Sequence, residues 1–80
     1  MIDDAILASE LRGLREANVS KDGASHPGIA LLKDMLSRAS GEDDRYVIYR
    51  HLVSELTLLR DFEGALEWAY KKWLLARTSG

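Results

Sequence analysis

Residues 58–76, LLRDFEGALEWAYKKWLLA, decide the fold of this 80-residue chain. They lie in a region, residues 44–77, that holds no proline and only one glycine, so one long helix could run through it. Apolar residues before Arg60 recur on one helical face, and those after Asp61 recur on another. At about 100° per residue, the two faces differ by roughly a quarter to a third of a turn. We therefore predict a break at Arg60 and Asp61, where the aspartate is a good N-cap.

The two apolar stripes also predict the core. They consist of Ile48, Leu52, Leu56 and Leu59 before the break, and of Phe62, Ala65, Leu66, Ala69, Trp73 and Ala76 after it. We expect a core centred on Leu52, Leu56, Ala65, Leu66 and Trp73, joined by Leu11, Leu14, Leu32 and Met35. The alternative to the break is one long C-terminal helix. A pattern of four-residue and three-residue steps from Val47 to Ala76 would give such a helix one continuous face along its whole length.

Two helices are expected before this region. In the first, Leu7, Leu11 and Leu14 recur at the spacing of one helical face. Asp3 and Asp4 fall in its first turn, where carboxylates favour the positive end of the helix dipole.

Pro27 opens the second helix, with Ser25 or His26 as its cap, because a proline in the first turn loses no hydrogen bond. The segment SGEDD then ends this helix. Gly41 can adopt the left-handed conformation of a helix terminus, and Asp43 can cap the next helix. These signals predict four helices in one all-α domain spanning residues 1–80, over about residues 3–17, 27–39, 44–60 and 61–77.

Residues 46–76 resemble a tetratricopeptide repeat. That family places an aromatic residue and large apolar residues on a first helix, an Asp-Tyr-like turn after it, and a small close-packing residue on a second helix. The residues at those positions are Tyr49, Leu52, Leu56, Asp61, Phe62 and Ala65. The pattern departs at Arg60, which replaces the turn glycine, and at Val53 and Ala69. The resemblance implies two antiparallel helical hairpins, in a bundle or a tetratricopeptide-like stack, and a role in binding proteins.

Composition restricts the class of protein. The chain has no cysteine, which excludes disulfides and thiolate metal sites and suits the cytoplasm, where we expect the protein. It begins MIDD, with acids where a signal peptide carries positive charge, so we expect an uncleaved chain. No apolar run approaches the length of a membrane span, so no membrane partner is expected. The net charge of −2 disfavours a dedicated nucleic-acid binder.

Residues that carry chemistry are few. His51 and Glu55 lie one helical turn apart, but a metal site needs a third ligand that the sequence does not supply. We therefore expect them to form a hydrogen-bonded pair. No phosphate-binding glycine loop or nucleophile with a signature context is present, so we expect no enzyme activity and no cofactor.

Trp68 lies about 120° from the predicted core stripe of the last helix, close to Leu75 and next to Lys72. The preceding helix has a similar second stripe, formed by Val47, His51 and Leu58. Helices with two apolar sides are typical of stacked layers or interfaces, so we expect these six residues to contact another protein chain, either a separate protein or a second copy in a homodimer. In the rival interpretation, Trp68 covers the edge of its own core.

The sequence thus favours a non-enzymatic protein–protein interaction module, a small helical adaptor, chaperone or regulatory domain. The alternative is a small helical regulator that contacts nucleic acid through its basic second half. Residues 45–80 hold six Lys or Arg against four Asp or Glu. The cations are Arg45, Arg50, Arg60, Lys71, Lys72 and Arg77.

Overall fold

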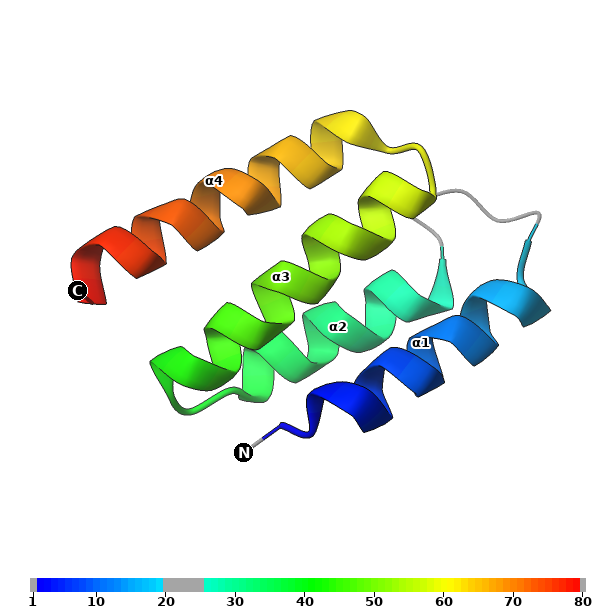
Figure 1. Cartoon of the computed structure of the whole chain (residues 1–80), viewed down its shortest axis with the longest axis horizontal. Coiled ribbons are helices and arrows are strands. Elements are labelled where there is room, and N and C mark those ends of the chain that lie inside the picture. Colours follow the sequence, from blue (N-terminus) through cyan, green and yellow to red (C-terminus); the bar gives the residue numbers. More distant parts are fainter. Residues whose placement is uncertain (1, 20–25, 80) are drawn as a thin grey trace.

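The computed structural model describes residues 2–19 and 26–79, which contain four helices and no strand. The helices are α1 (Asp4–Ala17), α2 (Pro27–Arg38), α3 (Glu42–Leu58) and α4 (Phe62–Ser79). Helices that follow one another in the chain run in opposite directions (Figure 1). The predicted all-α fold with four helices is confirmed, and the alternative with one long C-terminal helix is wrong.

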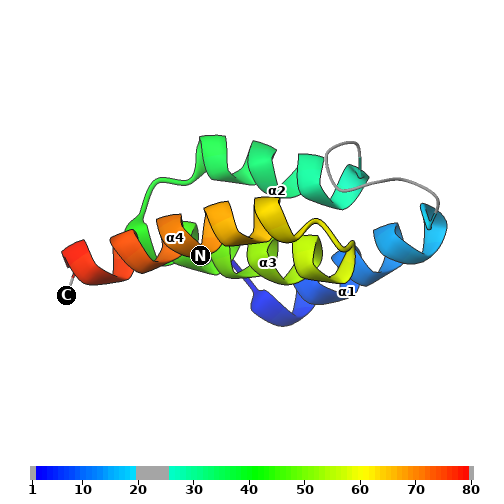
Figure 2. The same ribbon diagram turned by 90° about the horizontal axis from the view of Figure 1, so that it is seen from above.

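Helix α3 is the centre of the arrangement. Helices α1 and α2 lie on the side of it away from α4 (Figure 1), and the view from above shows α1 and α2 to either side of α3 (Figure 2). Among the described residues, α4 packs closely against α3 alone, whereas α1, α2 and α3 all contact one another. The structure is therefore a three-helix bundle with α4 added at one edge, and most of the α4 surface has no helix beside it.

The end of α3 is a Schellman motif. The amide N–H of Asp61 donates to the carbonyl of Leu56 at 2.9 Å, and that of Arg60 donates to the carbonyl of Thr57 at 3.1 Å. Arg60 has φ 66°, the left-handed conformation that glycine usually occupies at this position. The turn departs from the tetratricopeptide pattern in residue type, because an arginine takes the conformation of the missing glycine.

Helix α4 begins immediately after this turn. The Asp61 carboxylate accepts a hydrogen bond from the amide of Gly64 at 3.0 Å, as an N-cap does. A Cβ atom at Gly64 would lie 2.8 Å from that carboxylate, so the glycine leaves room for the cap. The predicted break at Arg60 and Asp61 is confirmed.

The other helix starts follow most of the sequence signals. Asp3 caps α1, and the Nδ1 atom of His26 caps α2 by accepting from the amide of Gly28 at 3.1 Å. Ser25, the other candidate cap, lies outside the described residues. The cap predicted at Asp43 is wrong, because α3 begins at Glu42 and Gly41 precedes it without a side-chain cap. Asp43 instead lies in the first turn, where its charge favours the helix dipole.

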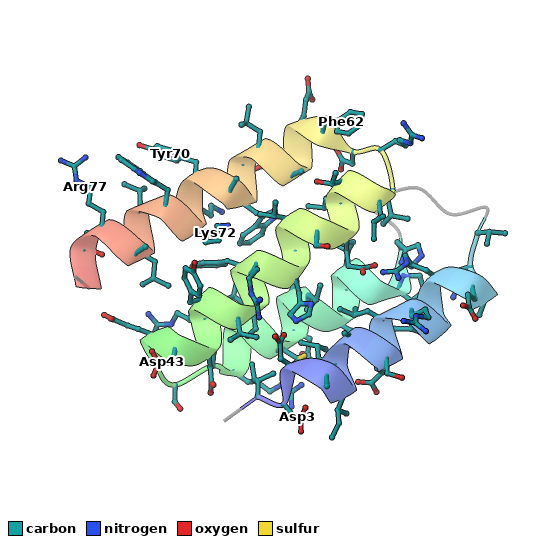
Figure 3. All side chains as sticks on the ribbon, viewed as in Figure 1. Asp3, Asp43, Phe62, Tyr70, Lys72 and Arg77 are labelled. Atoms are coloured by element: carbon teal, nitrogen blue, oxygen red, sulfur yellow. The ribbon has the colours of Figure 1, made fainter. Side chains whose placement is uncertain are left out.

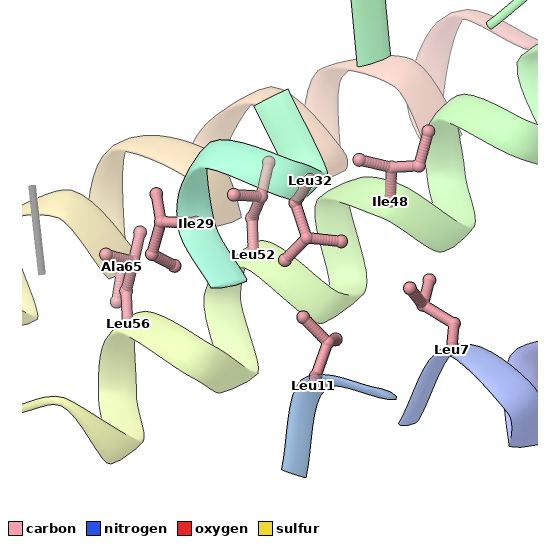
Figure 4. Close-up of a cluster of buried hydrophobic side chains, with 8 residues drawn as sticks. All are labelled: Leu7, Leu11, Ile29, Leu32, Ile48, Leu52, Leu56 and Ala65. Atoms are coloured by element: carbon pink, nitrogen blue, oxygen red, sulfur yellow. The ribbon is translucent and has the colours of Figure 1, made fainter. Parts of the chain in front are cut away.

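The core joins all four helices (Figure 4). Its buried apolar residues are Leu7, Leu11, Ile29, Leu32, Ile48, Leu52, Leu56 and Ala65. Helix α4 contributes Ala65 alone to this set, and Leu14 and Met35 are only partly buried. The prediction that Leu66 and Trp73 lie at the core centre is wrong, since they are 72% and 50% exposed. Helix α4 is rotated so that its other apolar edge, which carries Trp68, faces α3.

We expect Leu56→Ala to lower the free energy of unfolding by about 2–5 kcal/mol, because it opens a cavity in a closed core. Leu56 is 3% exposed, and Leu58 in the same helix is 57% exposed, so Leu58→Ala is the matched control. Urea unfolding measures both. A loss for Leu56→Ala no larger than that for Leu58→Ala would show that the core is assigned incorrectly.

We expect Arg60→Gly to stabilise the protein by about 0.5–1 kcal/mol. Glycine removes the steric cost of the left-handed conformation, partly offset by the greater freedom of glycine in the unfolded chain. Arg60→Val should destabilise the protein, because a β-branched residue fits this conformation poorly. Thermal melts of the two variants test the turn, and a lower melting temperature for Arg60→Gly would contradict it.

Candidate functional site

The inner edge of α4 is anchored to α3 by an aromatic pair. The ring centroids of Trp68 and Tyr49 lie 5.6 Å apart, and the Lys71 ammonium lies 4.2 Å from the Trp68 ring centroid. Trp68 is partly buried and packs against the core cluster. These contacts fix the rotation of α4 about its own axis, because an indole between the two helices leaves little room for another orientation.

The six residues expected to bind a partner do not form one surface. Lys72 lies on the side of α4 that faces α3 (Figure 3), and Leu75 and Val47 line one hollow between the two helices. His51 instead contacts the carboxylate of Asp4 in α1, and Leu58 is exposed at the end of α3. The structure therefore brings Val47 and Leu75 together and places His51 and Leu58 elsewhere. Their role in binding stays a prediction.

The opposite side of α4 carries a second apolar surface. Five large apolar side chains on it are between 37% and 72% exposed: Phe62, Leu66, Tyr70, Trp73 and Leu74. We call these five residues the outer face of α4. Phe62 and Tyr70 project away from α3, whereas Lys72 lies toward it (Figure 3). Helix α4 is therefore apolar on two sides, and only one of them packs against another helix among residues 2–19 and 26–79.

Part of the outer face is held in a fixed arrangement. The rings of Tyr70 and Trp73 stack with their centroids 6.0 Å apart and their planes at 23°. The guanidinium of Arg77 lies 5.1 Å from the centroid of the Trp73 ring. Side chains that already hold one another lose less conformational entropy when a partner covers them.

The sequence shows both apolar stripes of α4. In the stripe that predicts the core, Ala65 is buried as expected, but Leu66 and Trp73 are exposed. The signal that distinguishes the two stripes is the register of the hairpin. An antiparallel turn at Arg60 places Tyr49 beside the residues near position 70, and Trp68 is the aromatic residue on the edge that meets it. The number of apolar residues favours the outer stripe as the one that packs on the core. The pairing of residues across the turn favours the inner stripe for that role.

A buried polar pair lies within the three-helix bundle. Glu55 of α3 is 3% exposed, and its Oε1 atom accepts a hydrogen bond from the Arg15 guanidinium of α1. The prediction of a hydrogen bond between His51 and Glu55 is wrong, because Glu55 bonds to Arg15 and His51 contacts Asp4, both in α1. Burial raises the pKa of the Glu55 carboxyl, and the positive charge of Arg15 opposes this shift without reversing it.

His26 is the second buried polar side chain. Its Nδ1 atom caps α2, so the neutral ring carries its proton on Nε2. Among the described residues, neither that Nε2 atom nor Oε2 of Glu55 has a hydrogen-bond partner.

Asp4 joins α1 to α3 at the surface. Its carboxylate accepts a hydrogen bond from Arg50 at 2.5 Å and also contacts His51. The hydrogen bond from Arg50, and then that from His51, lowers the pKa of the Asp4 carboxyl. Within residues 2–19 and 26–79, no three His, Cys, Asp or Glu side chains come together as metal ligands would. The contacts of Asp4 with Arg50 and His51 link α1 to α3.

Compared with family models, with curated proteins and with solved structures, the chain matches none of them. The resemblance to a tetratricopeptide repeat thus stays a prediction. None of the helices in the described part of the chain is both long and apolar enough to cross a membrane.

We expect the stability of Glu55→Gln, relative to the parent, to increase as pH rises. Because the folded-state pKa of Glu55 is raised, its contribution to stability is complete below the ordinary pKa of 4.5 and is lost as pH rises through the folded value. Glutamine keeps an oxygen for Arg15 and cannot titrate. Urea unfolding at steps from about pH 4 to 8 measures the difference. The exposed Glu10→Gln is the control, and a difference for Glu55→Gln that falls or stays constant contradicts the expectation.

Proposed function

We propose that this protein is a protein–protein interaction module whose docking surface is the outer face of α4. The observation that carries the proposal is the set of five large apolar side chains exposed along α4, which packs closely against α3 and against no other helix in the described part of the chain. Exposed apolar patches of several hundred Å² on small proteins typically mark interaction sites, because they otherwise promote aggregation.

The composition of the outer face suits binding. Tryptophan, tyrosine and arginine are enriched among the residues that dominate binding energy, and Trp73, Tyr70 and Arg77 lie together here. The anchor between Trp68 and Tyr49 supports the surface from behind. A partner therefore meets a preformed helix face and does not have to order it.

The shape of the surface limits how a partner binds. A single helix is convex, so it docks into an apolar groove or against the apolar face of another helix. The tetratricopeptide resemblance supports the second mode, because such repeats stack one helical hairpin on the next. We include the cytoplasmic location expected from the sequence in this proposal.

The nucleic-acid alternative has less support. Of the six cations that it requires, Arg50 pairs with Asp4 of α1, and Lys71 pairs with Glu67 at 3.7 Å. Phosphate contacts need cations that face the ligand and are available to it. The apolar character of the outer face of α4 favours a protein partner.

Site-specific photo-crosslinking tests the proposal. A benzoylphenylalanine replaces Leu66 on the outer face or Ser9 on the exposed side of α1, in cells that produce the chain. We expect one dominant adduct from position 66, identified by mass spectrometry, and at most about a tenth as much from position 9. Trp73→Glu should abolish the adduct at position 66, because it places a charge in an apolar contact. Equal yields from the two positions would contradict the proposal.

A further inference from the structure

We infer that the chain which covers the outer face of α4 is α4 of a second copy, packed antiparallel about a two-fold axis. This inference rests on the proposed function and names the partner. It follows from the spacing of apolar residues along α4, the distribution of charge along the same helix, and the amount of exposed apolar surface.

The spacing is that of a helix-pairing seam. Phe62, Leu66, Ala69, Trp73 and Ala76 follow one another at steps of four, three, four and three residues. Helices that pair over a long distance repeat their apolar contacts in these steps. The seam runs over 15 residues, whose 14 steps of 1.5 Å span about 21 Å of helix. The small Ala69 lies at its centre, where two crossing backbones approach most closely.

The charges select an antiparallel arrangement. Acidic residues Glu63 and Glu67 lie in the first half of α4, and Arg77, the cation beside the outer face, lies in the second half. Lys71 pairs with Glu67 of the same helix, whereas Lys72 faces α3 (Figure 3). A parallel pair of helices would place like charges side by side. An antiparallel pair places the acidic half of each helix beside the basic half of the other. The two-fold axis repeats this contact at both ends of the pair.

One pair of charges defines the register. Glu63 and Arg77 lie on the same flank of the seam at about 100° per residue, and both are exposed. They are equally distant in sequence from Tyr70. In an antiparallel pair centred at Tyr70, one residue from the midpoint of the seam, Glu63 of each copy meets Arg77 of the other, and Leu66 lies opposite Leu74. Within one straight helix these charges are about 21 Å apart, so they cannot pair with each other.

The exposed area is sufficient for a specific dimer. With 150–250 Å² for a whole aromatic side chain, the exposed parts of the outer face amount to roughly 600 Å² per copy. If each copy covers the whole outer face of the other, including Tyr70 and Leu74 beside the seam, the two bury about 1,200 Å², the lower limit of stable specific interfaces. Helices α1 and α2 lie beyond α3 from α4, so they stand clear of a helix placed on the outer face (Figure 1).

Charge reversal tests the inference in the intact chain. Glu63→Arg and Arg77→Glu each turn the two intermolecular attractions into repulsions, so each variant alone should dimerise about tenfold more weakly than the parent. An equimolar mixture of the two variants restores both attractions in a mixed dimer. Sedimentation equilibrium should therefore give similar dimer dissociation constants for the parent and for the mixture, about tenfold below that of either variant alone, with a dimer of twice the chain mass of 9.0 kDa.

Two controls separate binding from folding. Glu10→Arg changes an exposed charge on α1 and should leave dimerisation unchanged. Leu66→Glu should weaken dimerisation at least about a hundredfold while the far-ultraviolet circular dichroism stays that of the parent, because Leu66 is 72% exposed.

Several results would overturn the inference. A parent chain that is monomeric up to about 1 mM excludes this dimer, since that limit corresponds to negligible affinity. If Leu66→Glu leaves the dimer dissociation constant unchanged, the dimer uses another surface. If the mixture of charge variants does not restore dimerisation, the two helices pair in another orientation. If the chain is monomeric and position 66 crosslinks to a different protein, the inference fails and the proposed function stands. If there is neither a dimer nor a crosslink, both fail.

Discussion

Asp61 ends one helix and begins the next, and the rest of the structure depends on this double role. Its amide N–H donates to the Leu56 carbonyl at the end of α3, and its carboxylate accepts from the Gly64 amide at the start of α4. Arg60 takes the left-handed conformation between the two helices. A residue that satisfies the orphan groups of both helices makes the break favourable where helix propensity alone would continue the rod.

The hairpin created by this turn explains the candidate surface. Helix α4 has one close helical neighbour in the described part of the chain and two apolar edges. The edge with Trp68 meets Tyr49, so the edge with Phe62, Leu66 and Trp73 is left in solvent. In a small chain such an edge is an aggregation risk unless it is covered, which is why we treat it as an interface. The charges along α4 then indicate how a second helix lies on it.

The sequence predicts the fold well because its main signals are local. Pro27, Asp61 and the apolar periods of α1 to α3 act within one or two helical turns, and four helices follow from them. The rotation of α4 and the partner of Glu55 depend on contacts between residues distant in sequence, namely Trp68 with Tyr49 and Glu55 with Arg15. Periodicity shows that a helix has two apolar edges but not which of them is buried. The exposed edge of α4 could therefore be identified only from the structure. The same limit explains why His51 was paired with Glu55 rather than with Asp4.

The central claim is that the inner edge of α4 carries Trp68 and its outer face carries Trp73. Nuclear Overhauser effects from the two indole rings test it most directly, because they identify the neighbours of each ring whether or not the chain dimerises. We predict cross-peaks between the ring protons of Trp68 and Tyr49, whose centroids lie 5.6 Å apart, and none from Trp73 to Leu52 or Leu56. Cross-peaks from Trp73 to those core leucines, with none between Trp68 and Tyr49, would contradict the account.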